Sequence, residues 1–328
     1  MDQFKRNALR YLPFLCIFIL ILVGPFFVKN DYLLHLGIMI GINLLLALGM
    51  RLILLIGQVS FAHAGFMAIG AYTSAMLSLY AGLSVWLAMP VAGLMAAVIA
   101  ILFGYPTLKI KGAYFFITSF AFTEIILLVV THWIEPFGGP TGLTSVPRLN
   151  PIVIPGLGSI RFLSEISYFY LILAIVTLAL LMMYRIDKSR FGLTIRAVGQ
   201  MDTIAQSTGI DIMKHKVMVF AIGSFWAGIA GSFYAHYTCY VGPGNFASPL
   251  GLNILVYAVF GGVGSVIGPV VGTAIFTILP EVTRVAKFYE PIFFGVSLVL
   301  AVLFLPEGLI TLPAWLKQWI GKENKITA

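Results

Sequence analysis

Apolar segments long enough to cross a lipid bilayer recur along almost the whole of this 328-residue chain. Hydrophobic residues make up 60% of the sequence and charged residues only 10%, whereas an ordinary soluble domain carries about 25% charged residues. One hydrophobic core cannot absorb this excess, so lipid must solvate most of the chain. The sequence therefore predicts an all-α polytopic membrane protein that forms a single transmembrane domain over residues 1–328, without a separate soluble domain.

The expected membrane segments fall into three groups. Seven have the length of a spanning helix, which needs roughly 20 apolar residues: Pro13–Val28, Leu33–Ile56, Ser60–Tyr80, Val85–Leu108, Gly112–Trp133, Tyr168–Tyr184 and Val217–Tyr237. Two shorter pieces follow at Leu250–Phe260 and Gly268–Leu279, and a last segment follows at Pro291–Leu305. We expect eight full spans and two short or half helices, or ten spans by a looser criterion. The first segment lacks a small-residue cleavage site after it, which predicts a retained anchor.

The basic residues predict the orientation of the chain. With the N-terminus inside, 15 of the 20 lysines and arginines lie on the inner side and five lie on the outer side. Cytoplasmic loops carry such an excess, so we expect both termini in the cytoplasm. The same bias explains the pI near 9.5 without a nucleic-acid partner. Residues 135–165 then form a periplasmic loop, and residues 185–216 form a cytoplasmic loop.

These two loops differ in composition and in the roles that they predict. The outer loop contains GGPTGL and several prolines, and three roles stay open for it: a cap over a pathway, a contact for an external partner, or a purely structural cap. The inner loop is a basic island that predicts a docking element. Its segment from Arg196 to Ser207 is compatible with a short surface helix, which Gly209 would end in a turn of positive φ. The alternative is a solvated loop whose charges only set the topology.

Glycines indicate where helices approach closely. Gly223, Ala227, Gly231 and Ala235 recur every four residues, a spacing that lets helices pack tightly in lipid. The cluster GGVGSVIGP lacks any charge that would anchor it in water, which predicts a broken helix buried at membrane depth. Its glycines are candidates for the lining of a translocation path: Gly261, Gly262, Gly264 and Gly268.

Few polar side chains lie within the apolar segments. Glu124 is the acid that we place deep in a span, where a carboxylate must be protonated, paired or wetted; it either lines a path or makes a structural hydrogen bond. Gln58, Ser60 and His63 lie near the inner start of another span. They are further candidates for the path, although a lone histidine there is more often a packing or capping group than a ligand.

Several kinds of site are not predicted. The motifs GxxxxGKS/T, HExxH, CxxC and GxSxG do not occur in the sequence, so we expect no nucleotide site, catalytic residue, cofactor or metal. The two cysteines, Cys16 and Cys239, lie in apolar surroundings and are expected to pack rather than to form a disulfide. An enzymatic function is therefore disfavoured.

Four blocks of the sequence resemble the membrane subunits of bacterial branched-chain amino acid ABC importers, particularly the LivM type. They are GQVSFAHAGFMAIGAYTSAML (57–77), KGAYFFITSFAFTEI with GGPTGL (111–143), FGLTIRAVGQMDTIAQSTGIDIMKHK (191–216) and VFGGVGSVIGPVVGTAIFTILPE (259–281). Together they span most of the chain in the order of the family. The chain departs from the family at Gly199 and Gln200, where a basic–acidic pair is common, at Gln206, where glutamate is common, and at Ile125–Leu128, which lacks an arginine.

The resemblance implies a permease in the bacterial inner membrane that works without catalysing a reaction itself. The implied partners are a second permease, two cytoplasmic ATPase subunits, a periplasmic substrate-binding protein and the membrane lipid. It also implies that the third block couples the permease to ATP hydrolysis, through the residues that match the family: Arg196, Ala197, Asp202, Ala205, Gly209 and Ile210. The alternatives are an ABC permease for urea, short amides or other small metabolites, an ion-coupled secondary transporter and, least favoured, a membrane enzyme.

Overall fold

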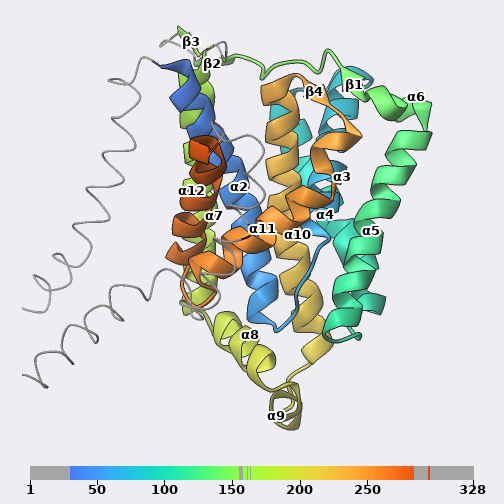
Figure 1. Ribbon diagram of the computed structural model, residues 1–328, viewed down its shortest axis with the longest axis vertical. Helices are drawn as coiled ribbons and strands as arrows, with labels where there is room; N and C mark the ends of the chain where they lie inside the picture. The colour runs from blue at the N-terminus through green and yellow to red at the C-terminus, as the bar shows by residue number, and fades with distance from the viewer. Residues whose placement is uncertain (1–29, 155–157, 161, 163, 284–294, 296–328) are drawn as a thin grey trace, which may run out of the picture.

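A computed structural model describes residues 30–154, 158–160, 162, 164–283 and 295. The expected anchor at Pro13–Val28, both termini, and all but one residue of the expected segment at Pro291–Leu305 lie outside the described residues. The long helices run side by side in a bundle, and two short helices extend from one end of it (Figure 1). We call this end the inner end.

The helices of the bundle match the expected segments closely. They are α2 (Asp31–Leu55), α3 (His63–Leu79), α4 (Val85–Thr107), α5 (Ala113–His132), α7 (Glu165–Lys188), α10 (Ile212–Thr238), α11 (Ser248–Gly261) and α12 (Ile267–Thr283). The helices at the inner end are α8 (Arg190–Gln200) and α9 (Asp202–Ser207). Side-chain caps fix several starts because they satisfy free backbone N–H groups. Asn30 caps α2, Ser189 caps α8 and Asp211 caps α10.

Six helical segments of the described residues are long and apolar enough to cross a membrane. They are α2, α4, α5, α7, α10 and the segment Pro243–Gly261, which joins the short helix η2 (Pro243–Phe246) to α11. Helix α3 has 17 residues, and α12 is also among the shorter helices. The structure thus confirms an all-α polytopic fold.

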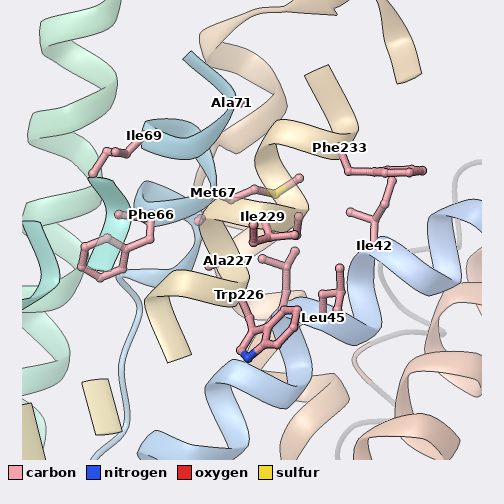
Figure 2. Packing of buried hydrophobic residues seen from close by; sticks show 14 of the residues in the cluster. Ile42, Leu45, Phe66, Met67, Ile69, Ala71, Trp226, Ala227, Ile229 and Phe233 are labelled. Atoms are coloured by element: carbon pink, nitrogen blue, oxygen red, sulfur yellow. The ribbon is translucent and has the colours of Figure 1, made fainter. Parts of the chain in front are cut away.

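Helix α10 forms the centre of the bundle because small residues let its neighbours come close. A Cβ on Gly223 would lie 2.7 Å from the carbonyl oxygen of Gly49 on α2, and Gly228 lies directly against Gly70 on α3. Larger apolar side chains fill the space around these contacts, including Leu45 on α2, Phe66 on α3 and Phe233 on α10 (Figure 2). The small-residue spacing of α10 is therefore used for close packing, as predicted.

The outer end of the bundle is closed by short irregular elements. They are α6 (Ile134–Phe137), η1 (Gly139–Thr141) and four strands, β1 (Leu143–Thr144), β2 (Ile152–Ile154), β3 (Gly158–Ile160) and β4 (Tyr240–Val241). Strand β1 pairs with β4 and β2 pairs with β3, both antiparallel. A buried hydrogen-bond chain fastens this end, since the His236 ring bonds both Ser74 Oγ (2.8 Å) and the Pro147 carbonyl (2.7 Å).

Candidate functional site

The basic loop forms two helices, where the sequence predicts one short helix between Arg196 and Ser207. That prediction was wrong, because Met201 adopts an extended conformation (φ −150°, ψ 97°) that ends α8 and begins α9. The predicted turn is confirmed: Gly209 has φ of 81°, a value that only glycine adopts without strain. Beyond this turn, Asp211 caps α10 and returns the chain to the bundle.

The six candidate coupling residues lie along these two helices and the turn that follows. Arg196 and Ala197 are in α8, and Asp202 and Ala205 are in α9. Ala205 is buried, and its carbonyl oxygen accepts a hydrogen bond from the Ile210 N–H (3.3 Å) after the Gly209 turn. Ala197 is exposed to solvent. One face of the loop therefore packs against the bundle, and its opposite face is exposed.

One ion network joins the loop to three parts of the bundle. Arg51, at the inner end of α2, is fully buried and makes two hydrogen bonds to the Asp187 carboxylate of α7, at 3.2 and 2.6 Å. Arg196 bonds the same carboxylate at 3.2 Å. The two arginines also reach the turn between α11 and α12, where they bond the carbonyl oxygens of Val263 (2.9 Å) and Gly264 (3.4 Å). Arg51 of α2 and Arg196 of α8 thus share the Asp187 carboxylate of α7, and both also hold the α11–α12 turn through its carbonyl oxygens.

A second network joins α9 to two other parts of the chain. The Asp202 carboxylate accepts from Lys111, just before α5, at 2.7 Å and from Lys216 of α10 at 3.1 Å. Partial burial alone would raise the pKa of Asp202, but the hydrogen bonds and positive charges of the two lysines outweigh it and lower that pKa below its usual 3.8. A cavity of about 290 Å³ lies at this junction, between the α2–α3 turn, Lys111 and the helices α8, α9 and α10.

The lowered pKa predicts how this junction responds to acid. A carboxyl group whose pKa is lower in the folded protein stabilises the fold above its unfolded pKa and loses that effect as the pH falls through the folded value. We therefore expect Asp202→Asn to lower the melting temperature by a constant amount between about pH 5 and 8, and the difference from wild type to shrink only below pH 3.8. Thermal unfolding of both proteins across this range measures it. A difference that disappears between pH 7 and 5 would contradict the lysine pairing.

The end of α8 meets the α2–α3 turn at Gly199, where backbone lies directly against backbone. A Cβ on Gly199 would overlap the Leu55 carbonyl oxygen, and Gly57 on the other side of the contact has φ of 73°. Any larger residue at position 199 would therefore separate α8 from the turn. Gln200, the next residue, is exposed.

The three polar path candidates near α3 have buried side chains, and one of them, Gln58, also lines the cavity at the Asp202 junction. Gln58, Ser60 and His63 are all buried. Gln58 Nε2 donates to the Ile110 carbonyl (3.3 Å), and the Ser60 hydroxyl accepts from the Ala62 N–H (3.2 Å). Neither ring nitrogen of His63 has a hydrogen-bond partner of acceptable geometry among the described residues, and Nε2 lies against Gly49.

Glu124 lies elsewhere, on the partly open side of α5. Its Oε1 accepts a 2.6 Å hydrogen bond from the hydroxyl of Ser248, the first residue of α11. Of the two roles that the sequence allows for Glu124, the structural hydrogen bond is therefore present. The side chain is nevertheless half-exposed.

The glycine cluster forms the tight turn between α11 and α12. Gly261 packs directly against Gly268, and Gly262 adopts φ of 104°. Gly264 lies in open space, and its carbonyl oxygen accepts from Arg196. The two short helices are thus held together as an antiparallel pair whose turn contacts Arg196 of α8.

Sequence reasoning missed the residues that connect these parts. Asp187 stands among Arg185, Lys188 and Arg190, so nothing local indicates a buried partner 136 residues earlier. The place of Ser248 just before Pro249 is typical of a helix start, but nothing in the sequence indicates its contact with Glu124. Within the described ranges, no three His, Cys, Asp or Glu side chains are placed to share a metal ion.

Comparison with known proteins supports one family. A family model described as "Branched-chain amino acid transport system / permease component" matches residues 32–305. The chain is 28% identical over 313 residues to the high-affinity branched-chain amino acid transport system permease protein LivM of Escherichia coli K12, covering 89% of this chain and 73% of that protein.

Other relatives match a smaller share of the chain. The probable branched-chain amino acid transport permease protein LivM of Methanocaldococcus jannaschii is 28% identical over 68% of this chain and 67% of its own length. The guanosine ABC transporter permease protein NupQ of Bacillus subtilis is 27% identical over 55% of this chain and 59% of its own length. No solved structure matches the chain. Since the family match covers most of the described helices, the chain belongs to the permease-component family of branched-chain amino acid transport systems and is a non-catalytic membrane subunit of an ABC importer.

Proposed function

We propose that this permease carries a branched-chain or related amino acid across the bacterial inner membrane as one half of a permease pair. Two cytoplasmic ATPase subunits drive it, and a periplasmic binding protein delivers the substrate. The similarity to LivM over 89% of the chain supports an amino-acid cargo. The similarity to a guanosine permease makes a nucleoside the second candidate, but it covers only 55% of the chain.

The proposed topology has eight full spans and two short helices, with both termini inside. Six of the full spans are the described helices α2, α3, α4, α5, α7 and α10, with α3 counted as a span although it has 17 residues. The other two are the segments Pro13–Val28 and Pro291–Leu305 that the sequence predicts. The segment Pro243–Gly261 also reaches the length of a span, but its helix α11 is counted with α12. Helices α11 and α12 are the short pair. Residues 135–165 then form the periplasmic loop, and residues 185–216 form the cytoplasmic coupling loop. The excess of lysine and arginine at the inner end supports this orientation.

The observation that carries the coupling assignment is the exposed apolar surface of the inner loop. Met201 and Ile204 are each 58% exposed, and helix α9, which Met201 precedes and which contains Ile204, lies beyond the end of the bundle (Figure 1). Apolar side chains gathered on a polar element outside the bilayer mark a protein-interaction surface. An ATPase groove that covers Met201 and Ile204 would move α9, and the Arg196 and Asp202 networks would pass that movement to α2, α5, α7 and α10.

Reconstitution tests the function directly. We expect proteoliposomes with both permeases, the ATPases and the binding protein to accumulate labelled L-leucine only when ATP is supplied. Accumulation against a gradient by this chain alone, without ATPase subunits, would contradict the proposed function.

The coupling surface has a sharper test. We expect Ile204→Asp to weaken ATPase association about tenfold or more, because it places a charge in an apolar interface. The matched control is Gln206→Asp, which introduces the same side chain two residues away at an already polar, exposed position. Copurification of the ATPase at graded concentrations measures both variants. Equal retention of the ATPase by Ile204→Asp and wild type would remove α9 from the interface.

A further inference from the structure

A carboxylate lies near the middle of the membrane-spanning region, where helices α5 and α11 meet. Glu124 is eight residues before the end of the 20-residue α5, about 12 Å along the axis at 1.5 Å per residue. Ser248, which donates to it, begins α11, and α11 crosses the bundle obliquely at mid-height (Figure 1). The glycine turn at the other end of α11 reaches the inner ion network. Helix α11 therefore runs from this carboxylate to the coupling apparatus.

Two aromatic side chains lie on the same face of α5 as the carboxylate. Phe116, Phe120 and Glu124 are spaced four residues apart on α5, so they form one stripe along the helix. Phe61 packs edge-on against both rings, with centroids 5.5 Å from Phe116 and 5.2 Å from Phe120. Phe61 is held in place by its backbone, because its N–H donates to Ser119 Oγ (2.8 Å) and its carbonyl accepts from Thr123 Oγ1 (3.1 Å).

The described side chains leave part of this stripe uncovered. Phe120 is 38% exposed, and Leu252 of α11, beyond the Ser248 contact, is 50% exposed. Phe116, Glu124 and Ser248 are all half-buried. Among the described residues, no lysine, arginine or histidine forms an ion pair with Glu124. One oxygen, Oε1, accepts from Ser248, and Oε2 accepts no hydrogen bond from the described part of the chain.

An acidic side chain at this depth and without a cationic partner is costly in lipid, so such residues mark substrate pathways or pair with charge from elsewhere. We infer that Glu124 binds the ammonium group of the transported amino acid while the rings of Phe116 and Phe120, supported from behind by the buried Phe61, receive its apolar side chain. This inference rests on the proposed function and specifies its cargo. A carboxylate beside aromatic faces attracts a cation through both charge and ring quadrupole, whereas neutral urea or an amide gains neither attraction.

Competition binding tests the inference on the nucleotide-free complex of both permeases and the ATPases. The probes are labelled L-leucine, 3-methylbutylamine, which keeps the ammonium group and the branched chain, and 2-hydroxy-4-methylpentanoate, which lacks the ammonium group. Leaving out the binding protein restricts the measurement to the membrane complex. We expect the amine to displace leucine from wild type and the hydroxy acid to displace it at least tenfold less well.

Variants of the chain assign the effect to Glu124. We expect Glu124→Gln to bind leucine about tenfold or more weakly and to lose displacement by the amine, and Glu124→Asp to retain part of both. The matched control is Glu165→Gln, which also removes a carboxylate that accepts one hydroxyl hydrogen bond, from Tyr237 at 2.6 Å, but at the start of α7. It should bind like wild type. Melting temperatures of all variants show whether each complex is intact.

The outcomes separate this inference from the proposed function. If the wild-type complex performs ATP-driven leucine uptake but Glu124→Gln binds leucine and the amine unchanged, Glu124 does not hold the ammonium group. Wild-type uptake of leucine without any displacement by the amine overturns the inference in the same way. If wild type takes up no amino acid with ATP and its binding protein, the proposed function itself fails.

Discussion

Replacing Asp187 with alanine is expected to lower the free energy of unfolding by about 3–5 kcal/mol, because it leaves a buried charge without its partner. Arg51 is fully buried, and Asp187 supplies both carboxylate contacts to its guanidinium. After the substitution, the Val263 carbonyl is the remaining hydrogen-bond acceptor of Arg51 within the described residues. Thermal and denaturant unfolding of the purified protein in nanodiscs measures the loss.

Two further variants distinguish a lost ion pair from general damage. Arg196→Ala removes a guanidinium that is 36% exposed, so we expect a loss of about 1 kcal/mol or less. The double variant Arg51→Met with Asp187→Leu removes both buried charges, and we expect it to regain most of the stability that Asp187→Ala loses. A double variant as unstable as the single one would mean that packing, not the unpaired charge, is responsible.

Substituting valine for Gly199 is expected to reduce ATP-driven uptake about tenfold or more while ATP hydrolysis continues. The new Cβ would overlap the Leu55 carbonyl oxygen, so the end of α8 must move away from the α2–α3 turn. Overpacking against backbone cannot be relieved by a side-chain rotation and costs about 1–3 kcal/mol or more. The ratio of leucine imported to ATP hydrolysed in proteoliposomes measures the uncoupling.

Thr194→Val is the matched control, since it places the same side chain in α8 at a half-exposed position. We expect this control to transport at close to the wild-type ratio. Gly199→Ala, with a smaller addition, should give an intermediate ratio if valine prevents assembly. Full coupling in Gly199→Ala and Gly199→Val would show that the close contact with Leu55 is dispensable.

The sequence was sufficient for the features that depend on local pattern. Apolar length located α2, α4 and α5 within about three residues at each end, and four-residue spacing of small residues identified the packing face of α10. Gly209 was correctly assigned to a positive-φ turn. Each of these properties is set by neighbours in the chain or by the lipid, so no distant partner is needed to infer it.

The features that were missed depend on contacts between distant segments. The break at Met201 divides a stretch that reads as one short helix, and it lets Arg196 and Asp202 meet separate partners, Asp187 and the two lysines. The pairing of Arg51 with Asp187 likewise exists only once α2 and α7 are side by side. Glu124 was identified as a candidate from its rarity, but its contact with Ser248 depends on where α11 begins. Such contacts follow from the tertiary fold and not from the pattern of either segment.

The glycine contacts at the centre of the bundle have a mechanical consequence. Where Gly223 meets Gly49 and Gly228 meets Gly70, backbone touches backbone with no side chain between them. Such a joint has no side-chain rotamers that can readjust, so close packing opposes the sliding of one helix past the other. Helices α2, α3 and α10 should therefore travel as one rigid body during transport. We expect opening and closing to be accommodated where α5 and the α11–α12 pair pack against this body, because side chains fill those contacts.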